Sequence, residues 1–170
     1  MDFRKELEKG QSKELTTAIV NKVANSSKKM KELMDCFIEG PMRITQRAAW
    51  PISFIAQKHP DLLLDYYNLL IDLLNKPGKH DAVNRNILRA FQFAVIPKKY
   101  QGRVLDISFK LLKSSTEPIA VKAFSMTVIY NLSKQYPDII PELKASIETL
   151  LPNASSGIKS RGLKILKAIQ

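Results

Sequence analysis

Apolar residues recur along this chain mostly at helical spacing, and no convincing stretch shows the period-two alternation of a strand. The helical pattern covers residues 61–74, 104–112 and 139–151. Residues that form turns or cap helices follow each of these stretches. Leu15, Ile19 and Val23 form a further apolar stripe, which predicts an amphipathic helix over residues 12–24. The pattern therefore predicts an all-α protein.

Three marks return together at a spacing near 38 residues. The first is a basic residue that opens a run of small and apolar residues; it occurs at Arg47, Arg85, Lys122 and Arg161, with spacings of 38, 37 and 39. The second is an apolar pair ten or eleven residues earlier, at 36–37, 73–74, 111–112 and 150–151. The third is a proline near the end of a unit, at Pro60, Pro97 and Pro137. A repeat of this length predicts stacked two-helix units, because one helical hairpin cannot bury its apolar faces alone.

We therefore predict one domain over residues 1–170, built as a right-handed α-α superhelix of about four helical hairpins with an N-terminal capping helix. The predicted ranges are 1–26 for the cap and 27–60, 61–97, 98–137 and 138–170 for the repeats. A turn is expected at residues 76–78, and Pro118 is expected in the first turn of its helix. Pro51 falls inside a predicted helix, where a proline is expected to produce a kink.

These marks resemble the HEAT and armadillo class of α-solenoids over roughly residues 27–170. HEAT units typically open their second helix with a Val-Arg pair, which Val83-Asn84-Arg85 and Val121-Lys122 approximate. The acid that usually stands in the preceding turn has no counterpart before Arg47 or Arg161. The resemblance implies a solenoid of HEAT type, an architecture that binds proteins or nucleic acids in different members.

The chain has a more distant likeness to the HEAT-like DNA-alkylation-repair glycosylases. Members with known activity place aromatic residues, largely tryptophan, beside an acidic residue in a basic groove. Here Trp50 is the single tryptophan, Arg47 lies one turn before it, and no carboxylate lies nearby at helical spacing. This likeness implies a shared fold class and a basic concave face rather than glycosylase activity.

The charge of the chain favours an acidic partner. Its formal net charge is +11 and its pI is about 9.8. Residues 1–85 hold 14 basic and 11 acidic residues, whereas residues 86–170 hold 13 and 5, so the excess lies mainly in the second half. A lysine-rich surface that only keeps the protein soluble explains the same excess.

Other features of the composition indicate a soluble, cytoplasmic protein. The 45% hydrophobic content is typical of a globular chain, and no apolar run approaches the roughly 20 residues that cross a bilayer. The N-terminal residues show no signal-peptide pattern. Cys36 is the single cysteine, so no internal disulfide can form, and it is expected to be buried and unreactive.

The candidate partner-binding residues are cations and one aromatic: Arg43, Arg47, Trp50, Arg85, Arg89, Lys122 and Arg161. The four cations of the repeat form a ladder near the starts of the second helices. They either pair with acids or carbonyls of neighbouring turns, or bind phosphates or carboxylates along a groove. Arg43 lies on the same helix face as Arg47, and Arg89 lies on the same face as Arg85. These four arginines form either a local anion site or a solvated rim. Trp50 is either an inter-repeat core residue or an exposed stacking platform.

No constellation of residues indicates catalysis, a cofactor or a metal. The only histidines are His59 and His80, which together with one cysteine do not supply a zinc site of usual spacing. The six glycines form no phosphate-binding loop. We therefore expect a non-enzymatic binding or scaffold module for an unknown protein partner. The alternative is a nucleic-acid-binding module that contacts the phosphate backbone through a basic concave face.

Overall fold

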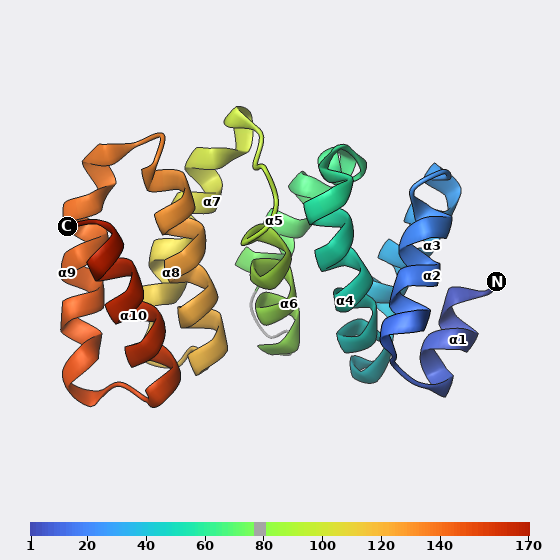
Figure 1. Ribbon diagram of the computed structural model, residues 1–170, viewed down its shortest axis with the longest axis horizontal. Coiled ribbons are helices and arrows are strands. Elements are labelled where there is room, and N and C mark those ends of the chain that lie inside the picture. Colours follow the sequence, from blue (N-terminus) through green and yellow to red (C-terminus); the bar gives the residue numbers. More distant parts are fainter. Residues whose placement is uncertain (77–80) are drawn as a thin grey trace. The chain divides into compact units, whose positions relative to one another are not determined.

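The computed structural model describes residues 1–76 and 81–170, and the regular elements in these ranges are helices without strands (Figure 1). The prediction of an all-α protein is therefore confirmed. The described chain forms two compact units, residues 1–95 (unit 1) and 96–170 (unit 2). Pro77 and Gly78 of the predicted turn, and His80, lie outside the described residues.

Unit 1 is built from six α-helices and one 3₁₀ helix among its described residues. These are α1 (Phe3–Lys9), α2 (Lys13–Val23), α3 (Ser27–Glu39), α4 (Met42–Lys58), η1 (Pro60–Tyr66), α5 (Tyr67–Asn75) and α6 (Asp81–Phe91). Helix α4 lies at the centre, because α2, α3 and α6 all pack against it. Its fully buried side chains, such as Ile52 and Ile55, form part of the core.

Side-chain caps define where the first three helices begin. Asp2, Ser12 and Ser26 each accept a hydrogen bond from the backbone N–H three residues further on, which satisfies a donor that the helix leaves without a partner. The sequence pattern predicted α2 but not α1. Helix α1 is short, yet its Phe3 and Leu7 are buried, so it forms a second helix within the predicted cap.

Unit 2 contains four α-helices and two short 3₁₀ helices. These are α7 (Lys98–Lys113), α8 (Ile119–Ser133), η2 (Pro137–Ile139), α9 (Ile140–Leu150), η3 (Leu151–Asn153) and α10 (Ser156–Ala168). Helix α8 packs against α7, α9 and α10, and buried side chains such as Met126 and Leu143 fill the space between them. Gly162 permits the close approach of α10, because a Cβ there would lie 2.8 Å from the Ile147 side chain.

Three local details differ from the expected pattern or refine it. Residues 61–74 do not form one α-helix, since the chain begins as η1 at Pro60 and becomes α5 only at Tyr67. Pro118 does not lie in the first turn of α8; it precedes that helix with an extended ψ of 156° and caps it with its carbonyl, which accepts from Lys122 N. Pro51 lies inside α4, which continues through it as one helix.

Candidate functional site

Unit 1 contains a cavity of about 330 Å³ between α2, α4 and α6, which is called the α4 cavity below. Its lining consists of Lys13, Thr16, Thr17, Val20 and Asn21 from α2, Trp50, Phe54 and Lys58 from α4, and Arg89 from α6. The volume is at the lower end of the range of ligand-binding pockets, and it suits one or two side chains.

Helical periodicity explains why these side chains meet. Trp50, Phe54 and Lys58 are four residues apart, so they form one stripe along α4. The α2 residues that line the cavity follow the same three-or-four spacing from Lys13 to Asn21. The opposite stripe of α4 is buried in the core, so the fold fixes which stripe faces the cavity.

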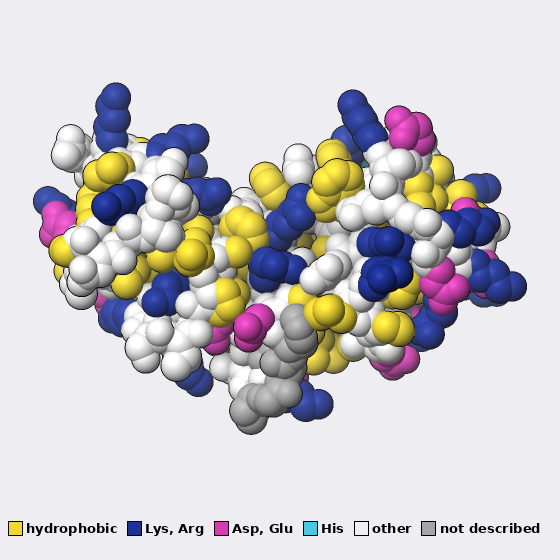
Figure 2. All heavy atoms as spheres, turned by 90° about the horizontal axis from the view of Figure 1, so that it is seen from below, with side chains coloured by type: hydrophobic (Ala, Val, Ile, Leu, Met, Phe, Trp, Pro, Cys, Tyr) yellow, Lys and Arg dark blue, Asp and Glu magenta, His cyan; other side chains and the backbone are white. Residues whose placement is uncertain are grey.

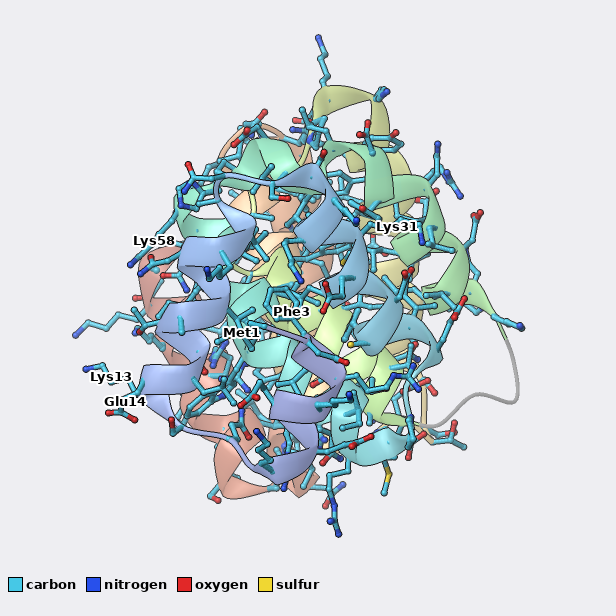
Figure 3. The ribbon with its side chains drawn as sticks, turned by 90° about the vertical axis from the view of Figure 1, so that its right-hand side faces the viewer. Met1, Phe3, Lys13, Glu14, Lys31 and Lys58 are labelled. Atoms are coloured by element: carbon cyan, nitrogen blue, oxygen red, sulfur yellow. The ribbon has the colours of Figure 1, made fainter. Side chains whose placement is uncertain are left out.

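The charges that line the α4 cavity are all positive. They belong to Lys13, Lys58 and Arg89, and no aspartate or glutamate of the described chain lines the cavity. Lys13 and Lys58 extend outward on the same side of unit 1, away from Lys31 (Figure 3). Glu14 lies beside Lys13 in the chain but outside the lining, and hydrogen bonds with its own backbone N–H and with Ser12 lower its pKa. The cavity therefore attracts anions.

Arg89 is the most constrained of these cations. Its guanidinium carbon lies 5.8 Å from the centre of the Trp50 ring, which is a cation–π distance. Burial, together with the charge of Arg85 one turn earlier, lowers the pKa of Arg89. Within the described residues Arg89 forms no ion pair with a carboxylate. A half-buried cation without a counter-ion is the strongest anion-attracting feature of the site.

The two threonines from α2 add little to anion binding. The Thr16 hydroxyl donates to the Ser12 carbonyl at 2.8 Å, and the Thr17 hydroxyl donates to the Lys13 carbonyl at 2.9 Å. Both hydroxyl hydrogens are therefore used within α2, which leaves lone pairs that can accept a hydrogen bond. A ligand would find its donors mainly in the three cations.

A larger hollow near the N-terminus, of about 600 Å³, has a different electrostatic character. Its lining contains Arg4 and three lysines together with three acids, two of which pair with lysines of the lining. Lys29 contacts Glu32 at 2.5 Å and Lys31 contacts Asp35 at 2.8 Å. Because acids line this hollow and pair with two of its cations, it is a weaker candidate than the α4 cavity despite its size.

The structure assigns different surroundings to the members of the predicted ladder. Arg47 donates from Nη1 to the carbonyl oxygens of Leu7 at 2.6 Å and Glu8 at 2.9 Å, so it caps the last turn of α1. In unit 2, Arg161 donates to Thr127 Oγ1 of α8. Arg85 and Lys122 are half-buried, and neither lines the α4 cavity.

The structure brings together only part of the predicted set of candidates. Trp50 and Arg89 meet in the α4 cavity, whereas Arg43 is exposed and Arg47 faces α1. Trp50 is half-buried, with Arg89 over its ring. Sequence reasoning missed Lys13, Phe54 and Lys58. The four-residue spacing from Trp50 to Lys58 was the available signal, but it did not reveal that α2 lies opposite this stripe.

The described helices show neither a metal site nor a membrane span. No three histidine, cysteine or carboxylate residues of the described chain are grouped so that they could hold a metal ion. Among the same residues, no helix combines the length and apolar character needed to cross a bilayer.

Paired helices that pack in succession within each unit define an α-helical repeat protein. The HEAT repeat domain family matches residues 3–169, and the chain therefore belongs to this family. The match also includes α1 and α2, which precede the region where the sequence resemblance was seen. No curated protein and no solved structure matches the chain.

Proposed function

We propose that this protein is a non-enzymatic binding or scaffold module and that a protein partner docks at the α4 cavity. HEAT repeats generally mediate protein–protein interactions or scaffolding, which supports the first part. The observation that carries the second part is the combination of an aromatic surface with cations that lack acidic neighbours. Tryptophan and arginine are also the residue types that dominate binding energy at protein interfaces.

The partner is expected to be acidic, because the net charge of the chain is +11 and the described lining of the cavity holds three of its cations and no acid. Lysine and arginine side chains also outnumber acidic ones on the face drawn in Figure 2. We place this interaction in the cytoplasm, as the sequence predicts. A nucleic acid remains the alternative occupant, since phosphates carry the same charge as carboxylates.

Capture of partners by the full-length protein tests the proposed function. The variant replaces Phe54 and Arg89 with alanine, which removes one aromatic and one cation from the cavity. The matched control is Lys22→Ala, which removes an exposed cation from α2 outside the cavity. We expect wild type and control to retain the same protein from a native lysate. The double variant should retain at least about tenfold less of that protein.

Two results would contradict this proposal. Equal recovery with all three proteins would show that the partner does not dock at the α4 cavity. Recovery that disappears after nuclease treatment would assign the binding to nucleic acid. In that case affinity for oligonucleotides should fall steeply between low and moderate salt, as phosphate-dominated binding does.

A further inference from the structure

The α4 cavity has an apolar part that a partner side chain could cover. Val20, Trp50 and Phe54 form this part of the lining, and Phe54 is 39% exposed although it is a large hydrophobic residue. Helix α4 holds both aromatic rings one turn apart. Covering apolar surface in a cavity is favourable, because a ligand displaces water from it.

The three cations of this lining form no ion pair with a described acid, unlike several cations elsewhere in the molecule. In unit 2, the hollow between α7 and α9 contains Lys113, which contacts Glu142 at 2.5 Å. In the N-terminal hollow, Lys29 and Lys31 are paired with acids in the same way. At the α4 cavity the counter-charge is missing from the lining, so a ligand would have to supply it.

Arg89 places a positive charge next to the apolar part of the cavity. Its contact with the Trp50 ring holds the guanidinium beside the aromatic surface rather than in open solvent. An anion that binds Arg89 therefore lies close to whatever covers Trp50 and Phe54. This geometry selects a ligand in which a carboxylate and a bulky apolar group are near neighbours.

The shape of the cavity favours a peptide over a nucleic acid. Its volume of about 330 Å³ holds one or two side chains. Nucleic-acid strands are bound along an extended cationic groove with successive aromatic platforms. Here Arg89 already lies over the Trp50 ring, and the described lining offers one further ring, that of Phe54.

We propose that the α4 cavity binds an acidic peptide segment that places an aromatic or large aliphatic side chain against Trp50 and Phe54 and a carboxylate against Arg89. Lys13 and Lys58 attract the acidic residues that flank this anchor. The inference rests on the proposed function, because it specifies the chemistry of the partner that docks there.

Trp50 provides a direct probe of binding, because it is the one tryptophan in the chain and lines the cavity. The test titrates the full-length protein with a capped, tryptophan-free peptide that carries two aspartates around one phenylalanine. Two further peptides carry asparagines in place of the aspartates or alanine in place of the phenylalanine. We expect the first peptide to shift the Trp50 emission, and each altered peptide to bind at least about tenfold more weakly.

Protein variants then locate the site by calorimetry. Arg89→Gln should weaken binding of the acidic peptide by about tenfold or more. Lys58→Gln should weaken it by about twofold to fivefold, since Lys58 is exposed. This second variant leaves the buried core intact, so it tests the site even if Arg89→Gln misfolds. Lys22→Gln, with the same loss of charge outside the cavity, should leave affinity unchanged.

Three results would overturn the inference: equal binding of the aspartate and asparagine peptides, no binding of any peptide, or tighter Arg89-dependent binding of a single-stranded oligonucleotide. These failures are distinct from failure of the proposed function. If lysate capture still depends on Phe54 and Arg89 while acidic peptides do not bind, the docking site stands and only the ligand chemistry is wrong.

Discussion

At the scale of single residues, two side chains hold α1 in place. The helix has 7 residues, which is too short for stability on its own. The Phe3 N–H donates to Glu32 Oε1 at 2.7 Å at its start, and Arg47 donates to two carbonyls at its end. Burial opposes ionisation of Glu32, but hydrogen bonds from Lys29 and the Phe3 N–H outweigh it and leave its pKa lowered. Charged groups thus complement both ends of the helix dipole.

Replacement of Arg47 with alanine should loosen α1 without unfolding the protein. Loss of a charge-assisted cap costs about 1–2 kcal/mol, so the amide hydrogens of α1 should exchange roughly ten times faster. Hydrogen exchange of the N-terminal peptides measures this effect. Arg43→Ala is the control, because Arg43 is an exposed arginine of α4, the helix that also carries Arg47. Unchanged exchange of α1 in the Arg47 variant would show that the cap does not stabilise it.

The roles of single residues were only partly predictable from the sequence. Cys36 is buried as expected, and burial raises the pKa of its thiol. The repeat marked Arg47 as a candidate binding residue but left two kinds of partner open. The sequence pattern did not predict α1, the helix that Arg47 caps. The α4 cavity could not be predicted, because it depends on the packing of α2 against α4. The sequence pattern of either helix alone does not show which helix packs against it.

At the scale of secondary-structure elements, an aromatic pair joins α5 to α6. The rings of Tyr67 and Phe91 are 5.5 Å apart with an interplanar angle of 26°. Both side chains are almost fully buried, and burial raises the pKa of Tyr67 to about 12. Offset stacking of this kind adds to the hydrophobic contribution of the two rings. The folded state therefore favours the neutral form of the Tyr67 phenol.

The raised pKa of Tyr67 predicts a loss of stability at high pH. A phenol that is harder to ionise in the folded state stabilises the protein fully below pH 10, its ordinary value, and this contribution is lost as the pH rises toward about 12. The loss should approach about 2–3 kcal/mol relative to Tyr67→Phe, in which this phenol is absent. Urea unfolding of both proteins from pH 8 to pH 12 measures it. Parallel pH profiles would contradict the prediction.

Helix boundaries show where sequence patterns were and were not sufficient. Apolar spacing predicted helices in the regions of α2, α5, α7 and α9. It did not reveal that residues 60–66 form a 3₁₀ helix, because hydrophobic spacing over so short a stretch does not separate the two helix types. Pro118 illustrates the one-residue uncertainty at helix ends, since a proline fits both before the helix and in its first turn.

At the scale of the whole molecule, the single domain over residues 1–170 stays a prediction. The described chain forms two compact units, yet the repeat spacing continues evenly across their boundary: 37 residues separate Arg85 in unit 1 from Lys122 in unit 2. Repeat proteins gain stability from the interfaces between neighbouring repeats. An unbroken repeat therefore favours cooperative unfolding of the two units.

A core substitution in one unit, observed from the other, tests this cooperativity. Leu143→Ala leaves a cavity at a fully buried position in unit 2 and should lower the free energy of unfolding by about 2–5 kcal/mol. Trp50 fluorescence reports on unit 1 alone, whereas circular dichroism reports on the helices of both units. If residues 1–170 unfold as one domain, the substitution should lower the urea midpoint equally by both probes. A Trp50 transition that stays at its wild-type midpoint would show instead that the units unfold independently.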